Sequence, residues 1–186
     1  MLRYILIGMS VLILIGVYMI SSLFGSDVTP QDGDKSFYEF KMPALSGEEV
    51  DFQKYKGKNI LVVNTASKCG YTYQYADLEK LHEQYGNQVE VLGFPANNFL
   101  WQEPGSNDEI AAFCEKNYVV KFQMFEKISV KGKDKHPLYR WLEAKTGKSP
   151  SWNFCKYVIS PEGEVVGFFP AKVSPLDPEI LSLLKN

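Results

Sequence analysis

Two strongly apolar runs constrain the fold of this 186-residue chain more than any other feature. Residues 59–65 (NILVVNT) and 89–94 (VEVLGF) are rich in β-branched and aliphatic residues, which is typical of strands buried on both faces of a sheet. Between them, residues 76–85 carry apolar side chains at helical spacing, and Gly86 follows as a C-terminal stop. Strand, helix and strand in this order form a βαβ unit. The sequence therefore predicts an α/β fold in which these two strands are parallel.

The rest of the chain after residue 35 predicts further short strands and helices. Residues 36–45 and 49–52 indicate a strand or hairpin at the entry to the domain, and residues 157–160 and 164–169 indicate a hairpin around a Pro-Glu-Gly turn. Three more helices are predicted from their N-terminal signals, which are a capping-box pattern at Ser106–Glu109, Pro137 with Gly147 beyond the end, and Asp177-Pro178. This order suits a central mixed sheet with helices on its faces.

The N-terminal segment indicates a membrane anchor. From Tyr4 to Phe24 the chain carries no charge, a run long enough to span a bilayer, and the residues after it fit a signal-peptidase site poorly. Arg3 precedes the run and acidic residues follow it, so the positive-inside rule predicts a catalytic domain on the extracytoplasmic, periplasmic side. If the segment is cleaved instead, we expect a secreted or periplasmic protein. We divide the chain into an anchor or signal peptide (1–26), a linker (27–35) and one domain (36–186).

Charge and composition exclude several functional classes. Twenty Lys and Arg against 22 Asp and Glu give a net charge of −2, and the chain has no strongly basic run, so we expect no nucleic-acid partner. Three cysteines are too few for a disulfide framework and leave at least one free thiol. His82 and His136 lack a metal-ligand spacing with other candidate ligands, so we expect no metal.

Cys69 lies between the first buried strand and the first helix, where its thiol can be activated. Backbone amides at a helix N-terminus and the charge of Lys68 both stabilise a thiolate. The residue three positions further on is Thr72, so a local CxxC dithiol is impossible. From this segment alone, an inert core cysteine is an equally good interpretation.

Six blocks extend the interpretation from Cys69 to the whole domain. In chain order they are NTASKCGYT (64–72), LGFPAN (92–97), QEPGSN (102–107), MFEK (124–127), HPLY (136–139) and WNF (152–154). Together they resemble the glutathione peroxidase family, from about Phe37 to Leu176. The resemblance implies a thioredoxin fold and a peroxidase that uses cysteine rather than selenocysteine.

The resemblance also implies a set of catalytic residues around Cys69, namely Gln102, Trp152 and Asn153. Their chemistry agrees with that role, because attack of a thiolate on an O–O bond needs hydrogen-bond donors for the departing oxygen. Amide and indole N–H groups supply these donors without a negative charge that would repel the thiolate. Taken singly, each of the three also fits an ordinary loop or core position.

Attack on peroxide leaves a sulfenic acid, and Cys114 is the candidate that resolves it. Cys114 matches the position at which two-cysteine members of the family, usually reduced by thioredoxin, carry their resolving residue. Its alternative is a buried core thiol on the apolar face of a helix. We therefore expect a peroxidase for hydrogen peroxide and organic hydroperoxides that uses a thioredoxin-like reductant and no bound cofactor. Direct reduction of Cys69 by glutathione, or a peroxide sensor or disulfide relay, remain open.

A few positions depart from the family pattern. Tyr73 stands where proline is usual, Ala96 where relatives often carry a cysteine, and Leu100 and Trp101 where glycines are usual. The last two precede Gln102 directly and could narrow the mouth of the site. Cys155 also departs from the pattern; in a strand it would share a face with Asn153, and a core thiol is its simplest interpretation.

Overall fold

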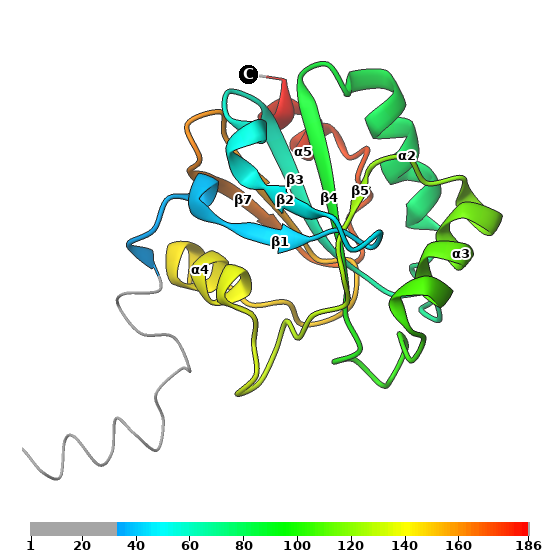
Figure 1. The fold of residues 1–186 in the computed structure, drawn as a ribbon. Helices are drawn as coiled ribbons and strands as arrows, with labels where there is room; N and C mark the ends of the chain where they lie inside the picture. Colours follow the sequence, from blue (N-terminus) through cyan, green and yellow to red (C-terminus); the bar gives the residue numbers. More distant parts are fainter. Residues whose placement is uncertain (1–32, 186) are drawn as a thin grey trace, which may run out of the picture.

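The computed structural model describes residues 33–185, which fold into a five-stranded mixed sheet covered by helices and a separate two-stranded antiparallel sheet (Figure 1). The strands are β1 (Lys41–Pro43), β2 (Glu49–Asp51), β3 (Asn59–Thr65), β4 (Val89–Pro95), β5 (Gln123–Met124), β6 (Lys156–Ile159) and β7 (Val165–Phe169). The helices are the 3₁₀ helices η2 (Phe37–Glu39) and η3 (Phe52–Tyr55) and the α-helices α2 (Gln74–Tyr85), α3 (Asn107–Tyr118), α4 (Pro137–Thr146) and α5 (Pro178–Leu184).

The central sheet has the strand order β5-β4-β3-β6-β7. β3 and β4 pair in parallel along their whole length, from Asn59–Val89 to Thr65–Pro95, and α2 connects them, so the predicted βαβ unit is confirmed. β6 pairs antiparallel with β3, and β7 pairs antiparallel with β6, which makes the sheet mixed as expected. Every residue of β3 is buried, in agreement with a strand at the centre of the sheet.

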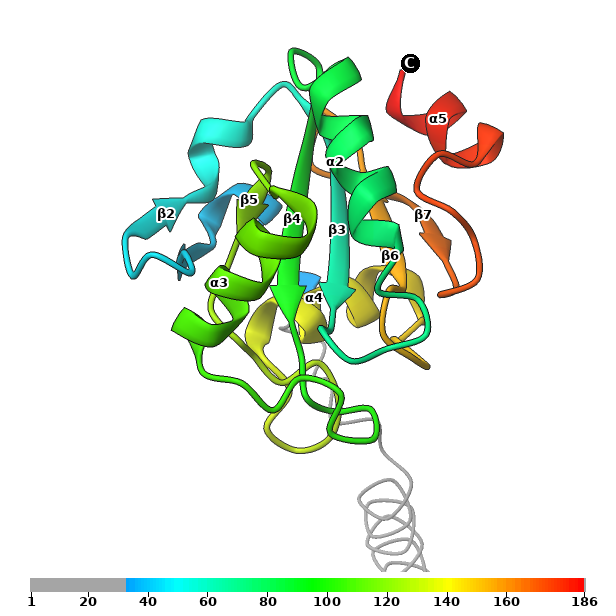
Figure 2. The same cartoon turned by 90° about the vertical axis from the view of Figure 1, so that its right-hand side faces the viewer.

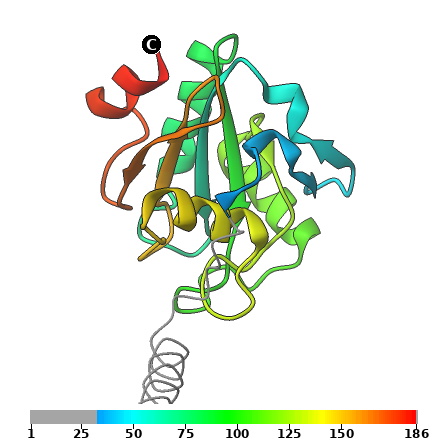
Figure 3. The ribbon, with the colours of Figure 1, turned by 90° about the vertical axis from the view of Figure 1, so that its left-hand side faces the viewer.

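Helices cover both faces of this sheet and divide the core into two clusters. On one face, β1, β2, the two 3₁₀ helices and α4 pack against Ile60, Val62 and Phe94 (Figure 3). On the other face, α2, α3 and α5 pack against Leu61 and Val63 (Figure 2). Successive residues of β3 point to opposite faces, so one strand supplies both cores.

The topology brings five loops to one edge of the sheet. β3, β4 and β5 are parallel, so the loops after them leave from the same edge. β6 and β7 alternate in direction, which places the loop before β6 and the loop after β7 at that edge too. In Figure 2 these loops gather at the bottom of the molecule. The five loops, called here the carboxyl-edge loops, are residues 66–73, 96–105, 125–136, 147–155 and 170–174.

The predicted helix ends are confirmed in detail. The Ser106 hydroxyl accepts a hydrogen bond from the Glu109 N–H, and the Glu109 carboxylate accepts one from the Ser106 N–H, which completes the capping box of α3. Pro137 lies in the first turn of α4, and the helix ends at Gly147 in the left-handed conformation. The Asp177 side chain caps α5.

Three details differ from the sequence prediction. β5 has two residues, too few for a periodic pattern, and was not predicted. α2 begins at Gln74 instead of Ala76, because three consecutive i→i+3 hydrogen bonds link the Cys69 turn to the helix. Asn153 and Cys155 do not share the face of a strand, because β6 begins at Lys156 and Phe154 has a left-handed φ of 65°.

The predicted anchor, residues 1–26, lies outside the described residues, as does most of the linker 27–35. Within residues 33–185, no helix has both the length and the apolar character needed to cross a membrane.

Candidate active site

Cys69 lies in a tight turn between β3 and α2 that is closed by Thr72. The Thr72 hydroxyl accepts a hydrogen bond from the Cys69 N–H at 3.0 Å and donates one to the Ala66 carbonyl at 2.9 Å. The Tyr71 N–H points to the Cys69 Sγ at 3.4 Å. Cys69 is partly exposed, so a small substrate can reach its sulfur. The Tyr71 N–H is placed to stabilise a thiolate at this sulfur.

Gln102 and Asn153 meet through their side chains, although they come from two different loops. The Asn153 Nδ2 donates a hydrogen bond to the Gln102 Oε1 at 2.9 Å. The Lys68 N–H donates to the Gln102 carbonyl at 3.0 Å, which ties this pair to the Cys69 turn. Because the Gln102 oxygen is occupied, its NH₂ group is the part of the amide left to bind another oxygen.

Trp152 and Asn153 belong to an irregular turn that a buried asparagine holds in place. The Asn64 Nδ2 donates to the Trp152 carbonyl at 3.0 Å, and the Asn64 Oδ1 accepts from the Cys155 N–H at 3.1 Å. Asn64 is fully buried near the end of β3, five residues before Cys69. The same strand therefore positions the cysteine turn and the Trp152–Asn153 turn.

The loop that precedes Gln102 has an unusual backbone. Leu100 and Trp101 both have a φ of 52°, a conformation that favours glycine and explains why glycines suit these positions. Their side chains are 68% and 78% exposed and so face solvent. Phe99, by contrast, is buried, and its ring lies 5.8 Å from the ring of Trp152. Leu100 and Trp101 thus keep the left-handed backbone that glycines would adopt, and they add two exposed apolar side chains to the loop before Gln102.

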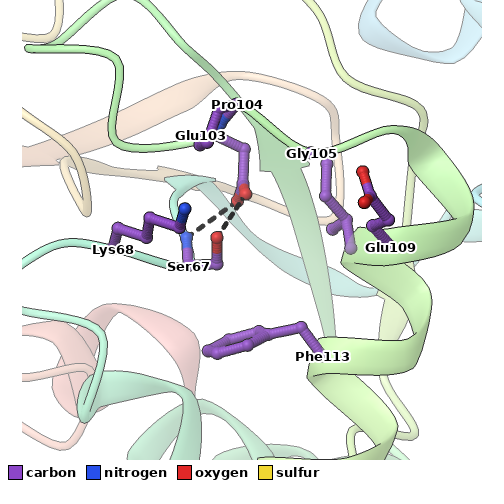
Figure 4. A pocket seen from close by; sticks show the side chains of 8 residues that line it. Ser67, Lys68, Glu103, Pro104, Gly105, Glu109 and Phe113 are labelled. Carbon is purple, nitrogen blue, oxygen red and sulfur yellow. Dashed lines mark hydrogen bonds between the residues drawn. The ribbon is translucent and has the colours of Figure 1, made fainter.

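Glu103 holds the junction between β3 and the Cys69 turn in place through Ser67. Its buried carboxylate accepts hydrogen bonds from the Ser67 N–H at 2.8 Å and from the Ser67 hydroxyl at 2.6 Å. Burial raises the pKa of the Glu103 carboxyl, while the Ser67 hydrogen bonds and the charges of Lys127 and Lys68 oppose that increase. Figure 4 shows Ser67 and Glu103 on one side of a pocket of about 360 Å³, facing Phe113 of α3. This pocket separates the Cys69 turn from the first half of α3.

Cys114 lies on the apolar face of α3, where it is 4% exposed. It belongs to the cluster on the α2–α3 side of the sheet, and Cys69 packs against the same cluster. Burial raises the pKa of the Cys114 thiol to about 11. The described structure therefore holds Cys69 and Cys114 as free thiols, with Cys114 shielded from solvent.

Cys155 is fully buried and free, as expected of a core thiol. The His136 ring caps α4 by accepting a hydrogen bond from the Leu138 N–H, and burial lowers the pKa of this histidine. His82, on α2, is partly buried. Among residues 33–185, no three His, Cys, Asp or Glu side chains lie close enough together to hold a metal ion.

Three residues that the sequence interpretation missed support the site. Asn64 and Glu103 hold the two turns, and Lys156 joins α2 to the loop after β7. The Lys156 ammonium is fully buried and donates to the Gln74 Oε1 at 2.5 Å and to the carbonyls of Ala171 and Val173. Burial lowers the pKa of Lys156 to about 8. For Asn64 and Lys156 the available signal was a polar or charged residue inside an otherwise apolar strand, which is rare without a partner, whereas Glu103 lies in the loop after β4 and had no such signal.

The chain is similar in sequence and in structure to several known proteins. The sequence model of the family described as "Glutathione peroxidase" matches residues 37–143. A glutathione peroxidase of Lactococcus lactis is 49% identical over 156 residues, which cover 80% of this chain and 99% of that protein. The crystal structure of GPX1 from T. cruzi matches with a TM-score of 0.61 and 34% identity, over 81% of this chain and 97% of the other.

A more distant structure shows the fold alone. The thiol:disulfide interchange protein of Chlorobium tepidum, a thioredoxin family protein, matches with a TM-score of 0.59 at 15% identity, over 78% of this chain and 92% of that one. The expected thioredoxin-like fold, a mixed central sheet with helices on both faces, is thereby confirmed for the described domain.

Proposed function

Because the chain belongs to the glutathione peroxidase family and is therefore a peroxidase, we propose that Cys69 is the residue that attacks the peroxide. The observation that carries this proposal is the environment of the Cys69 sulfur. It is partly exposed, receives the Tyr71 N–H, and lies on a turn that is hydrogen-bonded to Gln102. Neither of the other two cysteines combines exposure with a neighbouring donor, since both are buried.

In the proposed first step, the Cys69 thiolate attacks one oxygen of a hydroperoxide and the O–O bond breaks. Sulfur keeps the attacked oxygen as a sulfenic acid, and the other oxygen leaves with the electron pair and takes up a proton as water or an alcohol. The Gln102 NH₂ group and the Trp152 indole N–H are the donors proposed for the departing oxygen. Asn153 keeps the Gln102 amide in the orientation that offers its NH₂ group. No metal, haem or flavin takes part.

The proposed second step is attack of the Cys114 sulfur on the sulfenic acid, which gives a Cys69–Cys114 disulfide that a thioredoxin-like protein reduces. A disulfide needs Cα atoms within about 7 Å, so α3 has to open locally before the two sulfurs meet. The burial of Cys114 favours the same conclusion, because its thiol is covered in the reduced protein.

The burial of Cys114 also supports a second candidate route, which is direct reduction of Cys69 by glutathione. While α3 remains closed, a small external thiol has access to the partly exposed Cys69, and Cys114 is covered. In that route Cys114 is dispensable.

Peroxide consumption by the purified full-length protein tests both routes. We expect turnover with thioredoxin in the wild type and in Cys155→Ser, and its loss in Cys69→Ser and in Cys114→Ser. Glutathione-dependent turnover that survives Cys114→Ser contradicts the resolving role. No turnover with either reductant contradicts the peroxidase cycle and favours a disulfide relay, which transfers its disulfide to one partner protein.

We also propose that residues 1–26 anchor the domain on the extracytoplasmic side of a membrane, on the basis of the uncharged run 4–24 and the single preceding Arg3. The reductant then has to be a thioredoxin-like protein of that compartment. Reporter domains fused to the C-terminus test this topology. We expect activity from a reporter that works only outside the cytoplasm, and activity of a cytoplasm-only reporter contradicts the proposal.

A further inference from the structure

The residue that ends α3 has a strained backbone. Val119 follows the helix directly, with a φ of 50° and a ψ of 44°, which is the left-handed conformation. Among residues 33–185 it is the only β-branched residue with a positive φ. A β-branched side chain crowds the backbone in this conformation, so the conformation costs free energy. α4 also ends in a left-handed residue, but that residue is Gly147, which has no side chain to crowd.

No packing of the Val119 side chain compensates for this strain. The side chain is 54% exposed and belongs to neither core cluster. The next residue, Val120, packs against the α2–α3 cluster instead. The left-handed conformation of Val119 is therefore imposed by the structure on either side of it, and the residue relaxes when the end of the helix opens.

The hydrogen bonds that hold Val119 in this conformation involve Cys114. The Val119 N–H donates to the Glu115 carbonyl at 3.1 Å, and the Val120 N–H donates to the Cys114 carbonyl at 3.4 Å. Together they close the end of α3, and a left-handed residue at position 119 is part of this closing geometry. Unwinding of α3 from this end breaks both bonds, releases the strain and frees the backbone of Cys114.

The two sides of this helix end are held more firmly than the end itself. At the other end of α3, the capping box of Ser106 and Glu109 satisfies the first turn. Beyond Val120 the chain is fixed again at Lys121, whose N–H donates to the buried Glu79 carboxylate at 2.8 Å. The strained residue lies between these two fixed points. Local opening of α3 therefore begins most easily at the turn that carries Cys114.

We propose that Val119 is a positioning residue whose backbone strain favours opening of the end of α3 and so promotes formation of the Cys69–Cys114 disulfide. This inference rests on the proposed resolving function of Cys114. Once the turn has opened, the Cys114 sulfur attacks the sulfenyl sulfur of Cys69. The S–S bond forms, the S–O bond breaks, and the hydroxyl leaves with the thiol proton as water, so no further reductant or oxidant is needed.

The test relieves the strain in Val119→Gly and in Val119→Asn, two residues that adopt the left-handed conformation readily. Only glycine also makes the opened chain more flexible, so agreement between the two variants attributes the effect to strain. After a pulse of hydrogen peroxide, we expect both variants to form the Cys69 sulfenic acid at the wild-type rate and the disulfide about fivefold more slowly. A longer-lived sulfenic acid is exposed to further oxidation, so we also expect more Cys69 sulfinic acid by intact mass.

Val119→Thr is the matched control. Threonine keeps the β-branch, and with it the strain, and changes only the polarity of an exposed side chain. We expect this variant to form the disulfide at the wild-type rate. Slowing in Val119→Thr as large as in Val119→Gly overturns the inference, as do wild-type disulfide rates in Val119→Gly and Val119→Asn.

Amide hydrogen exchange of the reduced protein measures the opening without any chemistry at the cysteines. After correction for intrinsic rates, the Val120 N–H should exchange about fivefold more slowly in Val119→Asn than in the wild type, and the Gly147 N–H at the end of α4 should be unchanged. Equal exchange of Val120 in the two proteins overturns the inference. If the wild type forms no Cys69–Cys114 disulfide, the resolving role is wrong and the inference fails with it. That failure is distinct, because the exchange of Val120 still slows in Val119→Asn.

Discussion

At the scale of single residues, the candidate site depends on the hydrogen bond between the side-chain amides of Asn153 and Gln102. Asn153 is fully buried, its NH₂ group is used on Gln102, and its own Oδ1 has no hydrogen-bond partner among the described residues. A buried acceptor without a partner costs free energy, so this arrangement is unfavourable for the packed protein by itself. Its benefit is the fixed orientation of Gln102.

Exchange of Asn153 for aspartate tests that orientation. In Asn153→Asp the donor to Gln102 is lost, and a carboxylate stands against the Gln102 oxygen in its place, so the Gln102 amide loses its fixed orientation. We expect the second-order rate with hydrogen peroxide at pH 7 to fall by about a hundredfold, measured by stopped-flow. Asn117→Asp, on the exposed surface of α3, is the control and should keep the wild-type rate. Equal rates in the two variants contradict the role of Asn153.

Glu103 makes a second prediction, on the pH dependence of stability. Burial raises its pKa, so the folded protein binds this proton more tightly than the unfolded chain does. The resulting stabilisation is complete below the unfolded value of 4.5 and is lost as the pH rises through the folded pKa. Glu103→Gln has no proton to bind. Its free energy of unfolding should therefore lie furthest below that of the wild type near pH 4 and approach it towards pH 7, as measured by urea denaturation.

Glu109 provides the control with the opposite sign. The hydrogen bonds from Ser106 lower the pKa of Glu109, so its stabilisation is present above the unfolded value and is lost as the pH falls. Glu109→Gln should therefore differ most from the wild type near pH 7. If both variants show the same trend with pH, the assigned environment of Glu103 is wrong.

At the scale of elements, the strength of α3 sets how easily Cys114 is released. The capping box at Ser106 satisfies two backbone N–H groups of the first turn. Ser106→Ala removes one of these bonds and weakens the helix by about 1 kcal/mol. If opening of α3 limits resolution, the disulfide should form about fivefold faster after a peroxide pulse. Asp177→Ala weakens the cap of α5 in the same manner and should leave the rate of disulfide formation unchanged. If Asp177→Ala forms the disulfide as fast as Ser106→Ala does, opening of α3 is not the limiting step.

The elements that the sequence predicted well are those with local signals. The βαβ unit follows from apolar runs and spacing, and the helix ends follow from Ser106, Pro137, Gly147 and Asp177, each of which acts on its own turn. The irregular turn from Trp152 to Cys155 has no such signal. Its left-handed Phe154 is held by Asn64, which lies about ninety residues earlier in the chain. The conformation of this stretch is fixed by a distant partner, so the shared face that Asn153 and Cys155 would have in a strand is not formed.

The same distinction applies to the candidate site. Chemistry and family resemblance identified Cys69, Gln102 and Asn153, and the structure brings the last two into contact. The residues that hold them were not identified, since Asn64 contacts a turn 88 to 91 positions away and Glu103 contacts Ser67 across 36. A single sequence carries no information on such pairs. It does show that a polar residue interrupts an apolar strand, which is where a search for supporting residues can begin.

At the scale of the whole molecule, charge is distributed unevenly. The chain has a net charge of −2, yet the carboxyl-edge loops around Cys69 carry several exposed lysines and few exposed carboxylates. The exposed lysines of these loops are Lys68, Lys131, Lys133, Lys148 and Lys172. Glu103 lies in the same loops but is buried, so its charge acts inward. The edge that exposes Cys69 is therefore positive against a slightly negative background.

This asymmetry predicts that the oxidised protein reacts faster with anionic thiols than with cationic ones. Charges at an exposed edge raise the local concentration of an opposite charge, and salt screens the effect over about 10 Å at 0.1 M. We expect reduction by glutathione, which is anionic at pH 7, to slow at least about twofold between low and high ionic strength, and reduction by cationic cysteamine to accelerate. Lys172→Gln, beside Trp152, should lose part of this salt dependence, whereas Lys145→Gln on α4 should keep it. Salt responses of the same sign for the two thiols contradict the assignment, because only a charged edge distinguishes them.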